Sequence, residues 1–183
     1  VHEETVMKTS ISTLAFGIVL GLSSAIVVSP ASADRFTRFQ YANPDGGTTA
    51  GATRYRSGVN GSAARGHVVR TDGQGNAYAG SGGAFQSANG ASGARAGATY
   101  YGSDGSLQHQ SGMTASGTRG SVSSNGAATV GADGSVSQNR NSTLYNAATG
   151  NSYQGSTSYN QTGGLSHSAT CYDGAGNVIA CPR

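Results

Sequence analysis

Four arginines are concentrated in one short segment of the chain: Arg54, Arg56, Arg65 and Arg70. A guanidinium donates paired hydrogen bonds to carboxylate or phosphate, and the rings of neighbouring tyrosines can stack on flat groups. Contact with an anionic polymer would therefore use these four residues, whether the polymer is a glycan, lipopolysaccharide or extracellular DNA. The isoelectric point near 9.0 fits this interpretation, but it equally fits a surface charged only for solubility.

The other chemically active residues do not form the pattern of an enzyme. His67, His109 and His167 lie far apart, without the close spacing of a metal site. Lys8 is the sole lysine, so the remainder of the chain has no phosphate-binding loop of the Gly-Lys-Ser/Thr type. We therefore expect a protein without catalytic residues, metal ions or cofactors.

Cys171 and Cys181 are the only cysteines, and they bracket a glycine-rich turn near the carboxyl end. We expect a disulfide between them, since paired thiols in an exported protein are normally oxidised. If the two cysteines oppose each other across a hairpin, Asp173 pairs with Ile179 and the loop is residues 175–177. The stretch from Tyr172 to Gly176 resembles the Tyr-Asp-x-x-Gly core of the YD/RHS repeats, which are secreted hairpin arrays. That resemblance covers this one turn and implies a hairpin here.

The amino-terminal segment of the chain has the pattern of an export signal. Residues 1–6 read as upstream translation, because Glu3 and Glu4 stand where such a signal carries positive charge. Residues 7–33 have a short basic start, an apolar run from Ile11 to Val28, and small residues before Asp34 that suit a signal peptidase. We therefore predict cleavage before Asp34, no membrane span afterwards, and an extracellular, cell-surface or periplasmic location.

Residues 34–183 form one predicted domain of unusual composition. They contain neither lysine nor glutamate, which are among the best helix formers, so long helices are not expected. Large aliphatic residues and phenylalanine are few, and tryptophan is absent. Each buried aliphatic side chain contributes about 1.5–3 kcal/mol against an ordering cost of about 1–2 kcal/mol per residue. The composition therefore predicts a thin core.

Turn residues recur along the chain with a period of about 15 residues. Aspartate precedes glycine at positions 45, 72, 104, 133 and 173, and asparagine does so at 60, 89 and 125. Such dipeptides tolerate positive φ at both central positions of a hairpin turn. One glycine of each cluster defines the period, at positions 46, 61, 75, 90, 105, 120, 134, 150, 164 and 176. This spacing leaves strands of about 9–11 residues.

Between the turns, residue types alternate with a period of two, most clearly over residues 130–183. One predicted face of a strand carries Val136, Arg140 and Leu144, and another carries Leu165 and Cys171. We therefore predict an all-β fold, an antiparallel meander of hairpins with a repeat of about 15 residues. Two alternatives stay open: a β-solenoid, and a largely disordered glycine-rich chain with one disulfide-linked hairpin at its end.

These features lead to two expectations about function. The first is a secreted, non-catalytic structural protein of the cell surface or extracellular matrix, able to associate with itself through strand edges. Strands without proline, with low charge and rich in Asn, Gln, Ser and Tyr favour such contacts. The second is a monomeric module that binds an anionic surface polymer through Arg54, Arg56, Arg65 and Arg70. Neither expectation includes specific nucleic-acid recognition.

Overall fold

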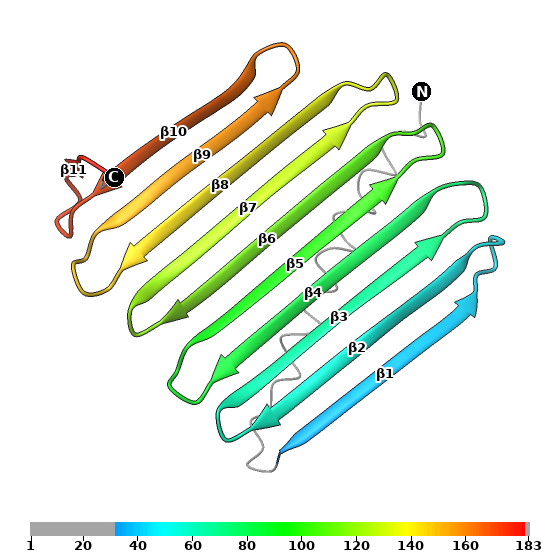
Figure 1. The fold of residues 1–183 in the computed structure, drawn as a ribbon, viewed down its shortest axis with the longest axis horizontal. Helices are drawn as coiled ribbons and strands as arrows, with labels where there is room; N and C mark the ends of the chain where they lie inside the picture. The colour runs from blue at the N-terminus through cyan, green and yellow to red at the C-terminus, as the bar shows by residue number, and fades with distance from the viewer. Residues whose placement is uncertain (1–31, 182–183) are drawn as a thin grey trace.

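The computed structural model describes residues 32–181, so residues 1–6 and nearly all of the predicted leader at 7–33 lie outside it. The described chain forms one antiparallel sheet of eleven strands, each paired with the next in sequence (Figure 1). The strands are β1 (Ala33–Ala42), β2 (Thr48–Gly58), β3 (Gly61–Thr71), β4 (Ala77–Ser87), β5 (Ser92–Tyr101), β6 (Leu107–Gly117), β7 (Gly120–Val130), β8 (Val136–Asn146), β9 (Ser152–Asn160), β10 (Gly164–Tyr172) and β11 (Val178–Ile179). The predicted hairpin meander is confirmed, and the solenoid and the disordered chain are wrong for these residues.

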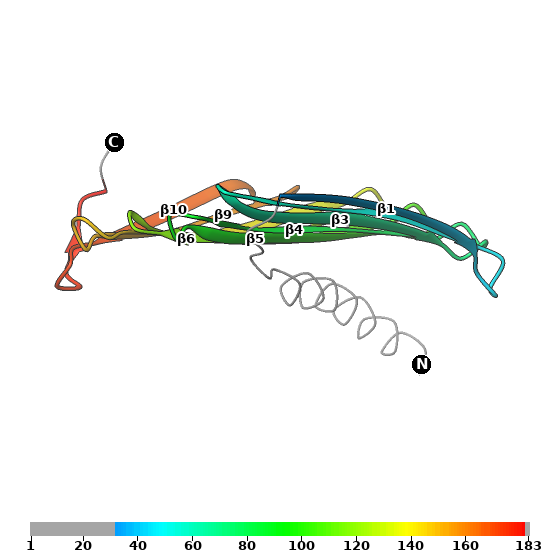
Figure 2. The same cartoon turned by 90° about the horizontal axis from the view of Figure 1, so that it is seen from below.

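The sheet is a single layer, which Figure 2 shows nearly edge-on as a thin, gently curved slab. Among the described residues, the buried apolar side chains are Ala52, Ala64 and Cys171 alone. Fourteen large apolar side chains are exposed instead. The predicted thin core is therefore confirmed, and backbone ladders, turns and cross-strand contacts must supply most of the stability.

The glycines that define the period occupy the turns. All ten of them have positive φ, and within residues 32–181 only Gly73 joins them. Glycine takes this conformation without the steric penalty that a Cβ would bring. Its spacing therefore sets where each strand ends.

Most of the aspartates act inside these turns. Five turns share one pattern, in which the first amide donates to the fifth carbonyl and the fourth amide donates to the first carbonyl; they begin at Asn43, Ser87, Gly102, Gly131 and Asp173. The fourth residue is a glycine with φ between 80° and 86°. In the third of them, Asp104 Oδ1 accepts the Ser106 amide at 2.9 Å. No described residue other than glycine has positive φ, so the expected turns with two such residues are wrong.

The Asn125-Gly126 dipeptide is not a turn, which corrects the prediction made from its sequence. Both residues lie inside β7 (Gly120–Val130), opposite Asn141 and Arg140 of β8. A Cβ on Gly126 would lie 2.7 Å from the carbonyl oxygen of Asn139. Glycine therefore stands here because a neighbouring backbone approaches closely, and not because the chain reverses.

The predicted disulfide is confirmed: Cys171 and Cys181 are bonded, with their Cα atoms 5.2 Å apart. The hairpin register differs from the prediction by two residues, because Cys171 pairs with Ile179 and Tyr172 pairs with Val178. The loop is the five-residue turn 173–177, in which Asp173 Oδ1 accepts the Asn177 amide at 2.8 Å. Because the turn is longer than predicted, Cys181 lies after the end of β11. The disulfide therefore joins Cys171 to a residue two positions beyond its strand partner Ile179.

Aromatic rings cover glycines of neighbouring strands. Phe39 lies opposite Gly51, and a Cβ on that glycine would lie 2.5 Å from the ring. Phe85 covers Gly93 in the same way, at 2.6 Å. Covering of this kind shields a glycine backbone and replaces the packing that its missing side chain would give. These pairs take the place of a core between β1 and β2 and between β4 and β5.

Hydroxyl groups form a second kind of cross-strand contact in the carboxyl-terminal half. Four close pairs join β7 to β8 or β9 to β10: Ser123–Thr143 at 2.6 Å, and Thr129–Ser137, Ser156–Ser168 and Ser158–Ser166 at 2.7 Å each. Pairs of this type each contribute roughly 0.2–1 kcal/mol. They help to keep the register on the side of these strands that carries few apolar residues.

Candidate functional site

The strand register divides the side chains between two faces. Directly opposed residues of antiparallel strands project on the same side. One row of opposed residues crosses the sheet from β1 to β10: Phe36, Arg54, Arg65, Gly83, Arg95, Met113, Ser124, Ser142, Gly155 and Ala169. We call the side that carries this row the arginine face, and the other side the serine face.

The predicted alternations agree with this division. The set that runs from Val136 to Leu144 and the set that runs from Leu165 to Cys171 both lie on the arginine face. On the serine face, the opposed residues of the same strands are mainly serine, threonine, asparagine and glutamine. The two faces of the sheet therefore differ in chemistry.

The register gathers basic side chains on the arginine face of β1–β5. This basic cluster consists of Arg38, Arg54, Arg56, Arg65 and Arg95. Arg54, Arg56 and Arg65 are among the expected polymer contacts, whereas Arg38 and Arg95 lie far from them in sequence. Arg38 and Arg95 lie in the cluster because side chains alternate along each strand and because β1 pairs with β2 and β4 with β5.

Asp34 is the one carboxylate among the strand residues on the arginine face, and it binds two members of the cluster. Its carboxylate accepts from Arg54 Nε at 3.1 Å and Nη2 at 2.6 Å, and from Arg56 Nε at 3.2 Å. The hydrogen bonds from Arg54 lower the pKa of Asp34, and those to Asp34 raise the pKa of Arg54. Both side chains are substantially exposed, so this pair adds little to stability.

Arg65 and Arg95 form no ion pair with any described carboxylate. They stand on either side of Gly83, which has no side chain to fill the space between β3 and β5. A shallow hollow of about 300 Å³ lies beside this row and extends over β1 to β5, lined on the arginine face by Phe36, Ala52, Arg54, Arg65, His67, Ser81 and Arg95. The hollow can receive an anionic group from solvent.

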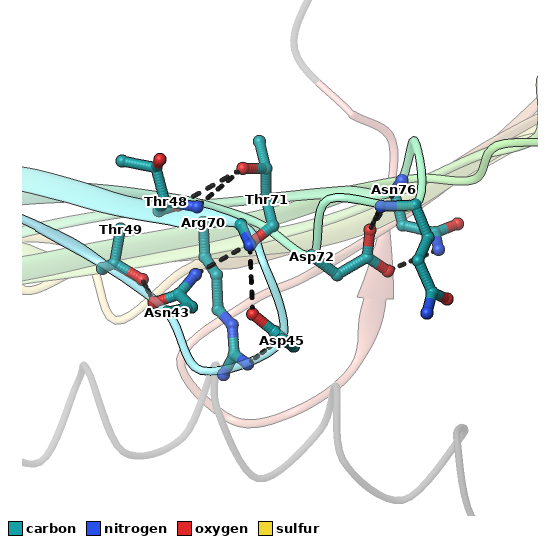
Figure 3. A network of polar contacts seen from close by, with 10 residues as sticks. Asn43, Asp45, Thr48, Thr49, Arg70, Thr71, Asp72 and Asn76 are labelled. Carbon is teal, nitrogen blue, oxygen red and sulfur yellow. Dashed lines mark hydrogen bonds and ion pairs between the residues drawn. The ribbon is translucent and has the colours of Figure 1, made fainter.

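Arg70, the fourth expected contact, lies on the opposite face of the sheet. Its Nη2 contacts Asp45 Oδ2 at 2.6 Å, at the turn between β1 and β2 (Figure 3). In the same turn, Asn43 Nδ2 donates to the Thr71 carbonyl at 2.9 Å and Asn43 Oδ1 accepts from Thr49 at 2.7 Å. Arg70 therefore links the end of β3 to the turn between β1 and β2 and is separate from the basic cluster.

The three histidines within residues 32–181 share the arginine face but remain apart on β3, β6 and β10. His109 Nδ1 lies 2.9 Å from Thr99 Oγ1, and His167 Nδ1 lies 3.0 Å from Thr157 Oγ1. Over residues 32–181, no three His, Cys, Asp or Glu side chains gather as ligands for a metal ion. The same residues contain no helix long and apolar enough to cross a membrane.

Among residues 32–181, nothing covers the two side edges of the sheet. β1 pairs with β2 on one side only, and its ten residues are all exposed. At the other edge, β11 pairs with Cys171 and Tyr172 of β10. This leaves residues 164–170 of β10 without a described neighbour on the outer side. Each edge thus presents backbone amides and carbonyls that a further strand can bind.

Comparison with known proteins gives no relative: no family model, curated protein or solved structure matches the chain.

Proposed function

We propose that this chain is an exported, non-catalytic structural protein that assembles edge to edge into extended single-layer sheets at the cell surface or in the extracellular matrix. The observation that carries the proposal is the pair of open edges on a sheet that buries almost no apolar side chain. A monomer of this shape leaves backbone amides and carbonyls at both edges without a strand partner, and it leaves many apolar side chains exposed. When copies join edge to edge, these backbone groups pair with the edge strand of the next copy.

The strand directions suit such repetition. Consecutive strands are antiparallel throughout, so β1 and β10 run in opposite directions. A second copy related by translation across the sheet would place its β1 beside β10 as another antiparallel pair. Its arginine face would remain on the same side. Contacts of this head-to-tail kind do not close, and they generate open filaments or sheets.

β11 helps to define the register of the joint. It occupies the outer side of Cys171 and Tyr172, so an incoming strand can pair with residues 164–170. If the row from Phe36 to Ala169 continues into the next copy, Ala169 faces the Phe36 of that copy. Thr170 then faces its Arg35, both on the serine face. The joint would add seven residue pairs to the sheet.

Export is supported by two features of the chain. Residues 7–33 have the signal pattern described above, and the bond between Cys171 and Cys181 is typical of oxidising compartments. A protein held together by exposed ladders also suits a setting where it is part of a larger layer. We therefore place the assembly outside the cytoplasm.

Charge substitution at Thr170 tests the joint. Thr170→Lys would place a positive charge opposite Arg35 of the next copy, whereas Thr170→Glu would place a negative one there. Like charges directly opposed destabilise a strand pair, and opposite charges stabilise it. Sedimentation velocity across a concentration series of purified mature protein should show weaker assembly for the lysine variant and stronger assembly for the glutamate variant.

Two controls accompany this test. Ser103→Lys adds the same charge at an exposed turn away from both edges and should assemble like the unmodified protein. Arg35→Glu combined with Thr170→Lys restores opposite charges and should restore assembly. If the unmodified protein remains a monomer up to millimolar concentration, the proposal is wrong.

A further inference from the structure

We propose that the hollow between Arg65 and Arg95 on the arginine face binds the carboxylate groups of an acidic polysaccharide. This inference goes beyond self-association, because the hollow lies on a face of the sheet and involves neither open edge. It rests on the placement of the arginines, the distribution of carboxylates, and the shape of the surface between β3 and β5.

The charge balance of this surface favours an anion. Asp34 engages Arg54 and Arg56, and no described carboxylate forms an ion pair with Arg65 or Arg95. The other described aspartates belong to turns at the ends of the strands. The field above the hollow is therefore positive, and an incoming carboxylate would offset it.

The shape of the hollow allows two guanidinium groups to act together. Arg65 and Arg95 belong to β3 and β5, so two strand spacings separate them, roughly 10 Å at the backbone. Both side chains are long enough to converge above Gly83. Each guanidinium can then donate a pair of hydrogen bonds to the same or adjacent carboxylates. The Ser81 hydroxyl and the His67 ring, which also line the hollow, can bind sugar hydroxyls.

An acidic polysaccharide fits this surface better than a nucleic acid does. Proteins that bind single-stranded nucleic acids combine a basic groove with several aromatic rings on which successive bases stack. Phe36 is the one phenylalanine, tyrosine or tryptophan lining the hollow, and the Arg38 guanidinium lies over its ring at 4.9 Å from the centroid. The remaining lining is small or basic. Repeated carboxylates without flat bases are therefore the matching chemistry.

Binding of polygalacturonate to purified mature protein tests the inference. Measurements at a concentration where sedimentation shows only monomers separate this binding from assembly. Arg65→Ala and Arg95→Ala should each weaken the affinity by at least about tenfold, since a hydrogen bond to a charged group contributes about 1.5 kcal/mol or more and about 1.4 kcal/mol corresponds to tenfold. Arg65→Lys should fall between the alanine variant and the unmodified protein, because it keeps the charge but loses the paired donors.

Arg140→Ala is the matched control, since it removes the same charge from the same face on β8, outside the hollow. It should change the affinity less than twofold, and neutral dextran should not bind. Equal losses for Arg140→Ala and Arg65→Ala would show a response to net charge alone and would overturn the proposal. So would tighter binding of a single-stranded oligonucleotide than of polygalacturonate. Unchanged circular dichroism of each variant ensures that a loss reports on the hollow and not on folding.

Discussion

The substitution Gly105→Ala tests whether turn glycines hold the sheet together in the absence of a core. Gly105 has φ = +85°, and nothing lies within 4 Å of the position its Cβ would take. The substitution therefore adds no clash with another residue, and its cost is that of the left-handed backbone conformation alone. For a residue with a Cβ this is about 1–2 kcal/mol. The hairpin of β5 and β6 should open more often by a factor of about 5–30.

Hydrogen exchange measured by mass spectrometry reports this opening directly. Peptides from the β5–β6 hairpin should exchange faster by that factor, whereas peptides from β1 and β2 should not change, because almost all contacts between strands join sheet neighbours. Ser103→Ala, in the same turn but without positive φ, is the control and should exchange like the unmodified protein. If Gly105→Ala also exchanges at the unmodified rate, the turns do not carry the stability assigned to them.

Three further outcomes follow from the same structure. Hydrogen bonds and nearby arginines lower the pKa of all six described aspartates, Asp34, Asp45, Asp72, Asp104, Asp133 and Asp173, so their contribution to stability is complete above about pH 4 and declines as the pH falls further. The melting temperature should therefore decrease below about pH 4, and an increase there would contradict this reasoning. Replacing both cysteines by serine should cost at most about 3 kcal/mol and should increase proteolysis near β10 and β11 only; cleavage spread evenly over the sheet would argue against local stabilisation. Phe85→Ala should uncover Gly93 and weaken the pairing of β4 with β5 by about 1 kcal/mol, measured by exchange of those strands, whereas Phe85→Tyr, which keeps the ring, should have little effect.

The turns could be predicted from the sequence because each depends on local chemistry. A glycine with positive φ is needed wherever the chain reverses, and a period of about 15 residues identifies these glycines. The same period argues against a turn at Asn125, which lies only five residues after Gly120. The dipeptide alone is misleading there, because glycine also occurs where a neighbouring backbone approaches closely. Its role in β7 depends on the position of Asn139, which sequence does not give.

The basic cluster was only partly predictable. Arg65 and Arg70 are five residues apart in one strand, so alternation already places them on opposite faces, and this signal was available. Arg38 and Arg95 join the cluster because β1 pairs with β2 and β4 pairs with β5 in a fixed register. That register depends on the lengths of the turns, which the arginine positions do not give. The carboxyl-terminal hairpin shows the same limit, since a five-residue turn places Cys171 opposite Ile179.

Exposure of large apolar side chains is a consequence of this architecture. A single-layer sheet exposes both of its faces to solvent unless a second layer covers one of them. Side chains such as Leu144 and Leu165, exposed by 52% and 72%, therefore stay on the surface of the isolated sheet. Glycines covered by aromatic rings, and hydroxyl pairs between strands, provide local substitutes for a core. These substitutes act between neighbouring strands, so added copies at an edge would be stabilised in the same way.

The axial repeat of the assembled protein tests the central claim most directly. If β10 of one copy pairs with β1 of the next, each copy adds ten strand spacings of about 4.7–4.9 Å, a repeat of roughly 48 Å along the sheet. X-ray fibre diffraction from oriented assemblies of mature protein measures both periods. The account predicts a strand reflection at about 4.8 Å and a subunit repeat of about 48 Å, without the strong reflection at about 10 Å that stacked sheets produce. A strong reflection from stacked sheets, without the longer subunit repeat, would contradict edge-to-edge assembly.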